Sequence, residues 1–428
     1  MGGGLAPGGT ASLRLPGQHF VASLAFLAAG AVGLVWIAPE LAAGSFLSIH
    51  VAGVTHLFTL GWLTTTIFGA LYQLLPVALG APVRSEMMGH ISFWCYVPGV
   101  ALFVAGILQN SIPLHHAGIA LIAVGMVLVI INVGLTLPRA TSRDVTWYSV
   151  ALALGFLAST LVLGIMLLHN LHTGYLGDHR VATLAVHLHV ALVGWVLTMI
   201  VGMSHRLLPM FLLAHGADTR WTQRALQFLP AGLPVFAVGM LIGLPAVTWA
   251  GVALMEAGAI CFFIQARSFA RARKRPRLDV GLRFTGIAVL FLALSAVLGP
   301  IVLAVGGTRH PRLATAYVLT GLLGGMALFV VGQFYKIVPF LAWIARFRGR
   351  IGREKVPTVA ELYSSRAAHL QLVLMVGGVS VLLPAIAAGS TSAFRVGAAA
   401  FALGVAVFIS QMIRVMTVGR RSSAATSG

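Results

Sequence analysis

Long apolar segments follow one another along almost the whole chain, and they constrain its fold more than any other feature. Each is roughly 20 residues or longer, the length that an α-helix needs to cross a hydrocarbon core about 30 Å thick. Charged residues make up only 9% of the 428 residues, against about 25% in a typical soluble domain. The sequence therefore predicts an all-α integral membrane protein, because a membrane β-barrel would show alternating segments of about ten residues.

Twelve such spans can be placed along the sequence, and the connections between them are too short for a soluble domain. The longest connections are polar segments around residues 267–280 and 344–366. We therefore expect a single polytopic membrane domain over residues 1–428. The predicted spans, numbered in chain order, cover residues 20–38, 48–78, 88–108, 114–137, 147–169, 181–213, 222–245, 247–266, 281–306, 311–343, 367–388 and 393–416.

The basic residues indicate how these spans are oriented. The formal net charge is +19, and Lys and Arg concentrate in every second loop, including the run RARKRPR at 271–277. Such an excess marks cytoplasmic loops, which predicts a bacterial inner (plasma) membrane protein with both termini in the cytoplasm. Because topology accounts for the charge, we expect the lipid bilayer as a partner and no nucleic acid.

A threefold internal repeat is visible in spans 2, 6 and 10. Span 2 reads HLFTLGWLTTTIFGALYQLLPV from His56, and span 6 reads HVALVGWVLTMIVGMSHRLLPM from His189, with nine of 22 positions identical. Span 10, LTGLLGGMALFVVGQFYKIVPF from Leu319, keeps the same glycines and proline. The offsets of 133 and 130 residues correspond to four spans. The sequence thus predicts three pseudo-symmetric four-helix repeats, at approximately 20–137, 147–266 and 281–416.

Four histidines of spans 2 and 6 are candidate site residues. Ionisable side chains inside a bilayer are costly and are functional candidates by default, although one hydrogen bond to a neighbouring helix can also satisfy a neutral histidine. His56 and His189 occupy equivalent positions of two repeats, and the predicted topology places them with His50 and His187 in the outer half. His187 and His189 lie roughly 200° apart around an ideal helix, so one helix can serve two sites.

The segments THLFTLGW (55–62) and HLHVALVGW (187–195) resemble the histidine-bearing helices of the haem-copper oxidase subunit I superfamily. This superfamily includes cytochrome c oxidase subunit I and the nitric oxide reductases, and the chain also resembles the twelve-span NnrS family of haem and copper proteins. The resemblance implies one or two b-type haems, held non-covalently because the chain has no Cys-x-x-Cys-His motif. It also implies that copper is a candidate cofactor.

The repeat and the resemblance together suggest axial ligands for such a haem. Threefold symmetry places spans 2, 6 and 10 around a common centre, so His56 and His189 should lie at similar depth. We expect these two to be the principal ligands, with His50 and His187 as a second pair or as supporting contacts.

The chain departs from the oxygen-reducing members of the superfamily where they bind copper. Those members carry histidines on helices 6 and 7 for this purpose, whereas span 7 here, TQRALQFLPAGLPVFAVGMLIGLP, contains none. Oxygen reduction by the usual route is therefore not expected. Whether the protein is an enzyme stays open: it can be a haem oxidoreductase subunit without the usual copper ligands, and its catalytic residues are unknown.

Two further features carry chemistry. In LHNLHTGYLGDHR (168–180), His169 and His172 share a helix face, and with His179 they can bind copper or zinc, since imidazole suits both metals; the alternative is a polar cap that ends a helix. Glu256 is the only acidic residue predicted inside the hydrocarbon. It can carry protons, bind a cation or pair with a nearby base.

These observations leave three functions to compare. The first is a haem-binding inner-membrane protein in electron transfer or in redox handling of nitric oxide or oxygen. The second is a degenerate terminal oxidase or nitric oxide reductase subunit, which would need a cytochrome or quinol as electron donor. The third is a copper or small-solute transporter, although transporters more often use inverted repeats than parallel ones.

Overall fold

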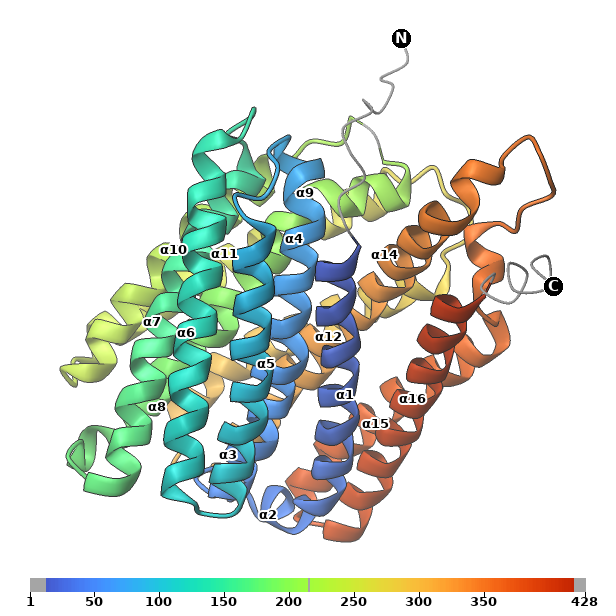
Figure 1. Ribbon diagram of the computed structural model, residues 1–428. Helices are drawn as coiled ribbons and strands as arrows, with labels where there is room; N and C mark the ends of the chain where they lie inside the picture. Colours follow the sequence, from blue (N-terminus) through green and yellow to red (C-terminus); the bar gives the residue numbers. More distant parts are fainter. Residues whose placement is uncertain (1–12, 215, 419–428) are drawn as a thin grey trace.

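The computed structural model describes residues 13–214 and 216–418, and every regular element within these ranges is a helix (Figure 1). Twelve helical segments are long and apolar enough to cross a membrane. The prediction of an all-α membrane protein with twelve spans is therefore confirmed. His215 falls outside the described residues.

The spans follow the predicted order, and short helices connect several of them. The first four spans consist of α1 (Arg14–Trp36), α3–η1–α4 (Ile49–His56, Leu57–Thr64, Thr65–Leu79), α5 (Glu86–Leu108) and α6 (Ile112–Thr136). The next four are α7 (Val145–Thr173), α8–η4–α9 (Arg180–His189, Val190–Leu197, Thr198–Leu212), α10 (Arg220–Leu241) and α11 (Pro245–Arg271). The last four are α12 (Val280–Val305), α13–η5–α14 (Pro311–Leu319, Thr320–Ala327, Leu328–Phe347), α15 (Ser365–Ala388) and α16 (Thr391–Thr417).

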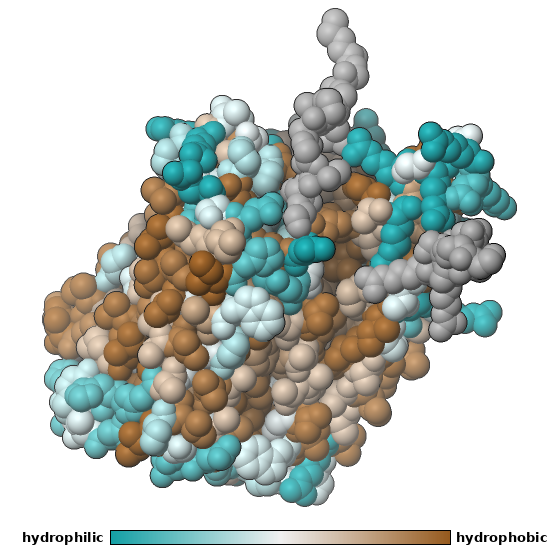
Figure 2. All heavy atoms as spheres, in the orientation of Figure 1, coloured by the Kyte–Doolittle hydropathy of each residue, from teal (hydrophilic) through white to brown (hydrophobic). Residues whose placement is uncertain are grey.

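The surface has a hydrophobic band between two hydrophilic ends (Figure 2). Large apolar side chains are exposed around this band, among them Val32, Trp94 and Leu290, each 68% to 69% exposed. A soluble protein seldom exposes so much contiguous apolar surface, whereas lipid tails cover it at no cost. The chain is thus a multi-pass membrane protein.

The two ends of the bundle differ in composition. The end where α1 begins and α16 ends also holds loops 80–85, 140–144, 213–219, 272–279 and 351–364, and we call it the basic end. The opposite end, here the histidine end, holds the shorter connections, including 109–111 and 174–176.

Spans 2, 6 and 10 form the interior of the bundle. Their apolar windows are 67%, 56% and 83% buried, more than those of any other span. The Trp195 indole N–H donates to the Thr64 hydroxyl over 3.1 Å, which joins span 6 to span 2. The Trp62 ring lies 5.0 Å from that of Phe334 and so joins span 2 to span 10.

Each of these three spans contains one π-helical segment, and the sequence did not predict this feature. The segments η1, η4 and η5 are eight residues long and begin at residues 57, 190 and 320. The offsets of 133 and 130 residues equal those of the sequence alignment. π-Helical turns are uncommon and are frequent at functional sites.

The aligned glycines let the first helix of each group of four pack against the second. A Cβ atom at each would lie only 2.6 to 2.7 Å from a phenylalanine side chain of the preceding span. The pairs are Gly61 with Phe26, Gly194 with Phe156, and Gly324 with Phe291. These glycines therefore have a packing role, as small residues at membrane helix interfaces usually do.

Aspartates at the basic end begin two of the spans and bind a basic residue of the next span. Asp144 caps α7 through the amides of Thr146 and Trp147, and its other oxygen pairs with Arg206. Asp279 caps α12 through the amide of Leu282.

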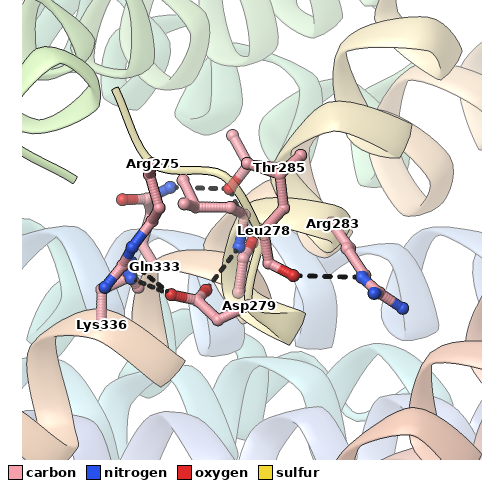
Figure 3. Close-up of polar contacts among 9 residues, drawn as sticks. Arg275, Leu278, Asp279, Arg283, Thr285, Gln333 and Lys336 are labelled. Atoms are coloured by element: carbon pink, nitrogen blue, oxygen red, sulfur yellow. Dashed lines mark hydrogen bonds and ion pairs between the residues drawn. The ribbon is translucent and has the colours of Figure 1, made fainter. Parts of the chain in front are cut away.

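Asp279 lies at the centre of the network drawn in Figure 3. Its carboxylate pairs with Lys336 of α14 and, over 2.7 Å, with Arg275. Gln333 of α14 donates to the Thr285 hydroxyl of α12 over 3.0 Å. Arg206 and Lys336 occupy matched positions of spans 6 and 10. Each of these long side chains pairs with the aspartate that caps the preceding span at the basic end.

Candidate functional site

His56 is the last residue of α3, directly before the π-helical segment η1. Its Nδ1 donates to the Ala52 carbonyl over 2.7 Å, which leaves the lone pair on Nε2. The ring meets Phe103 of α5 edge to face, with centroids 5.2 Å apart. In the neutral form of the ring, this hydrogen bond fixes both the tautomer and the orientation of the side chain.

His189 repeats this arrangement at the end of α8. Its Nδ1 donates to the Ala185 carbonyl over 2.7 Å. Its Nε2 therefore accepts the hydrogen bond from the Tyr317 hydroxyl of α13, over 3.0 Å. The Phe236 ring of α10 lies 4.7 Å away, so this histidine faces spans 7 and 10.

His187 faces the other side of the same helix. A Cβ atom at Gly164 of α7 would lie 3.3 Å from its Cε1, so the glycine provides the space that this ring occupies. His56 is close enough to interact with His187 electrostatically. The Nδ1 of His187 is buried and makes no hydrogen bond of normal geometry within the described residues, although the Thr160 backbone is near.

The structure thus places the four candidate ligands differently from one another. His56 packs against Phe103 of α5, His187 lies beside Gly164 of α7, and His189 contacts Tyr317 of α13. His50 lies at the histidine end, where its Nδ1 donates a hydrogen bond to the Glu40 carboxylate over 2.8 Å. The Trp36 ring lies 5.0 Å from that of His50, so His50 is bound locally.

Glu256 of α11 is the acidic residue whose charge acts on the Tyr317–His189 pair. It interacts electrostatically with Tyr317, whose hydroxyl donates to His189. The only hydrogen bond among these three side chains in the described part of the chain is the one between Tyr317 and His189, and Glu256 lies within electrostatic range of the phenol. Polar groups in this position commonly line proton or ion paths.

The predicted metal ligands His169, His172 and His179 do not lie together. His169 packs against the Tyr175 ring with centroids 5.2 Å apart. His179 precedes α8, where its carbonyl accepts from the Thr183 hydroxyl. His172 instead meets two histidines from the start of α6.

His115, His116 and His172 form a compact cluster at the histidine end. One ring nitrogen of each lies within 4.8 Å of the others, and the Nε2 atoms of His115 and His172 are 2.8 Å apart. Neither His115 nor His116 was predicted from the sequence to belong to a metal site. The sequence does contain a signal for this cluster, because spans 4 and 5 are neighbours in the chain and both carry histidines at this end.

Two cavities lie away from these histidines. One of about 540 Å³ opens at the histidine end beside Arg309, His310 and Arg312. The other, of about 80 Å³, lies between spans 2, 6 and 10 and is lined by apolar side chains such as Met199 and Phe329. Neither is lined by His56, His187 or His189.

No protein-family model matches the chain, and a search of curated proteins finds no match either.

Proposed function

We propose that the protein binds b-type haem within the membrane and takes part in electron transfer or in redox handling of nitric oxide or oxygen. The observation that carries this proposal is the half-buried group His56, His187 and His189, on two central helices at the start of their π-helical segments. The donor chemistry fits haem iron, which binds neutral imidazole through one ring nitrogen while the other is held by a hydrogen bond. His56 meets this requirement through its Nδ1 bond to Ala52.

Either of two histidine pairs would hold the haem iron. His56 with His189 is the pair that threefold symmetry favours, and both have the same Nδ1 hydrogen bond. The nearness of His56 to His187, and the unsatisfied Nδ1 of His187, support His56 with His187 instead. In that case His189 keeps its hydrogen bond from Tyr317 and does not hold the haem.

Haem supplies one-electron chemistry and, where an axial position opens, a site for a diatomic gas. The chain's own residues would orient the ligands and exclude water. The Ala52 and Ala185 carbonyls fix the imidazole tautomers, and Phe103 packs against the His56 ring. An oxidoreductase subunit of this kind would receive electrons from a cytochrome or a quinol.

The architecture we propose is three pseudo-symmetric repeats of four helices in a bacterial inner membrane. Three observations support it: the matched π-helical segments, the matched glycine–phenylalanine contacts, and the acidic caps that bind Arg206 and Lys336. The concentration of Lys and Arg supports a cytoplasmic basic end, with both termini on that side.

The optical spectrum of the purified protein tests the haem proposal. We expect a Soret band and a pyridine haemochrome of b type. His56→Ala should abolish the haem or convert it to high spin, and the same change in either His187→Ala or His189→Ala identifies the second ligand. Haem-free protein from haem-replete cells would refute the proposal, and an unchanged low-spin spectrum in all three variants would remove these helices as its ligands.

A copper transporter is the second candidate, and the cluster of His115, His116 and His172 favours it. Such a protein would contain copper without haem. Metal analysis and the haemochrome assay on one sample therefore separate the two functions.

A further inference from the structure

We propose that His115, His116 and His172 bind one transition-metal ion that prefers imidazole, Cu²⁺ or Zn²⁺, at the histidine end of the bundle. The site joins the start of α6 to the end of α7. It differs from the intramembrane histidines and does not rest on the haem proposal.

The spacing of the ring nitrogens suits a single ion. Two imidazole nitrogens bound to a tetrahedral ion at about 2.0 Å lie about 3.3 Å apart. The Nε2 atoms of His115 and His172 are 2.8 Å apart, so a small rotation of either ring admits the ion. The His116 ring stacks on that of His172 with centroids 5.4 Å apart, and its donor atom lies within 4.8 Å of the others.

A hydrogen bond orients one of the three ligands, and burial restricts a second. The Nδ1 of His116 donates to the Ile112 carbonyl over 2.8 Å, which leaves Nε2 as the ligand atom. His115 is fully buried, and its Nδ1 has no hydrogen-bond partner among the described residues. Within the described part of the chain, its only side-chain hydrogen bond is to another imidazole that can equally bind metal.

A comparison within the chain shows that helix packing does not require a histidine here. A Cβ atom at Gly106 of α5 would lie 2.3 Å from the backbone nitrogen of His115. The contact recurs 133 residues later, where Gly239 meets the nitrogen of Thr248 at the same 2.3 Å. In the second pair of helices, α10 and α11, a threonine takes this position, and its hydroxyl donates to the Leu244 carbonyl at the start of its own helix. Close packing of the two helices therefore does not by itself explain a histidine at position 115.

The position of the site also suits an exchangeable ion. His116 and His172 are exposed at the end of the bundle, while His115 forms the buried floor. Three imidazoles leave a fourth position for water or for a passing ligand, as in open zinc sites. The site can therefore accept metal from the aqueous phase on that side.

The test is titration of the purified full-length protein with Cu²⁺ and, separately, with Zn²⁺. We expect one ion to bind, Cu²⁺ more tightly than Zn²⁺, with nitrogen hyperfine structure in the Cu²⁺ spectrum. His116→Ala and His172→Ala should each weaken binding by at least the roughly 10–100-fold that losing a supporting contact to a ligand costs. Both side chains are exposed, so the variants should fold.

His169→Ala is the matched control, since this histidine lies on the same helix end as His172 but packs against Tyr175. Its metal affinity should equal that of the unmodified protein. Loss of binding in His169→Ala and His179→Ala but not in His116→Ala would overturn the assignment, as would the lack of stoichiometric binding of either ion. The haem spectrum should be unchanged in these variants, so failure of this site and failure of the haem proposal are distinguishable.

Discussion

The intramembrane histidines differ in how their ring nitrogens are used, and this difference decides what each can bind. His56 keeps Nε2 available, whereas the Nε2 of His189 accepts from Tyr317 over 3.0 Å. His187 has a buried Nδ1 with no regular hydrogen bond in the described part of the chain. Unsatisfied buried polar groups are costly, so His187 is where a bound group would gain most.

Tyr317→Phe tests the contact with His189. Removing the hydroxyl leaves the Nε2 of His189 without a donor, which should lower the free energy of unfolding by about 1–3 kcal/mol. Tyr175→Phe is the control, because that exposed hydroxyl lies 3.4 Å from the Met166 carbonyl and contributes little. Denaturant unfolding of both variants in the same detergent gives the comparison. Equal stability of the two would mean that the Tyr317 bond contributes nothing.

At the scale of the helices, close contacts at glycines and acidic caps hold the spans in register. Gly202 of α9 allows Ser149 of α7 to approach so closely that an added Cβ would lie 2.1 Å from the serine Cβ. The serine Cβ cannot rotate away, so the helices themselves would have to separate. These glycines therefore fix the distance between neighbouring spans.

Gly202→Ala and Gly155→Ala should change stability in opposite directions. Gly202→Ala forces α7 and α9 apart and should lower the free energy of unfolding by about 1–3 kcal/mol, as overpacking of a core does. Gly155 lies on an exposed face of α7 with nothing within 4 Å of an added Cβ, so alanine should stabilise the helix by roughly 0.5–1 kcal/mol. Thermal unfolding of the two proteins measures the difference, and a loss of stability in Gly155→Ala would contradict it.

Asp279→Asn separates the capping role of this residue from its charge. Asparagine caps a helix as well as aspartate, but it leaves Lys336, whose side chain is 11% exposed, without its counter-ion. We expect a loss on the order of 2 kcal/mol, below the roughly 3–5 kcal/mol of a fully buried pair. The exposed Asp218–Arg220 pair provides the control, since Asp218→Asn should cost roughly 0–1 kcal/mol. Chemical unfolding of both variants tests this, and equal losses would show that Lys336 does not depend on Asp279.

At the scale of the whole molecule, an even number of spans places both ends of the described chain at the basic end. Three heavily buried spans form the interior, and the other nine surround them. The two kinds of histidine site therefore differ in their surroundings: one lies among central helices, and the other faces the aqueous phase at the histidine end.

Reporter fusions test the orientation of this bundle. Fusions after residues 142, 275 and 350 lie in loops of the basic end and should report the cytoplasm, because basic loops are retained there. Fusions near residues 44, 111 and 177 should report the opposite side. If the fusions at 177 and 275 report the same compartment, the twelve-span frame is wrong, and if the two compartments are exchanged, the histidine end is not the outer face.

The sequence by itself determined the twelve spans, the all-helical class and the alignment of spans 2, 6 and 10. This is because hydropathy and the backbone hydrogen bonds of a helix depend on residues that are close along the chain.

Only the tertiary structure decided which side chains meet. His172 joins His115 across 57 residues instead of joining His169 three residues away, because α6 and α7 pack with those two faces together. Tyr317 reaches His189 across 128 residues, and His187 turns towards Gly164 and His56. Such contacts depend on how each helix is rotated about its own axis and on the space that single glycines leave. The hydropathy of the sequence contains neither kind of information.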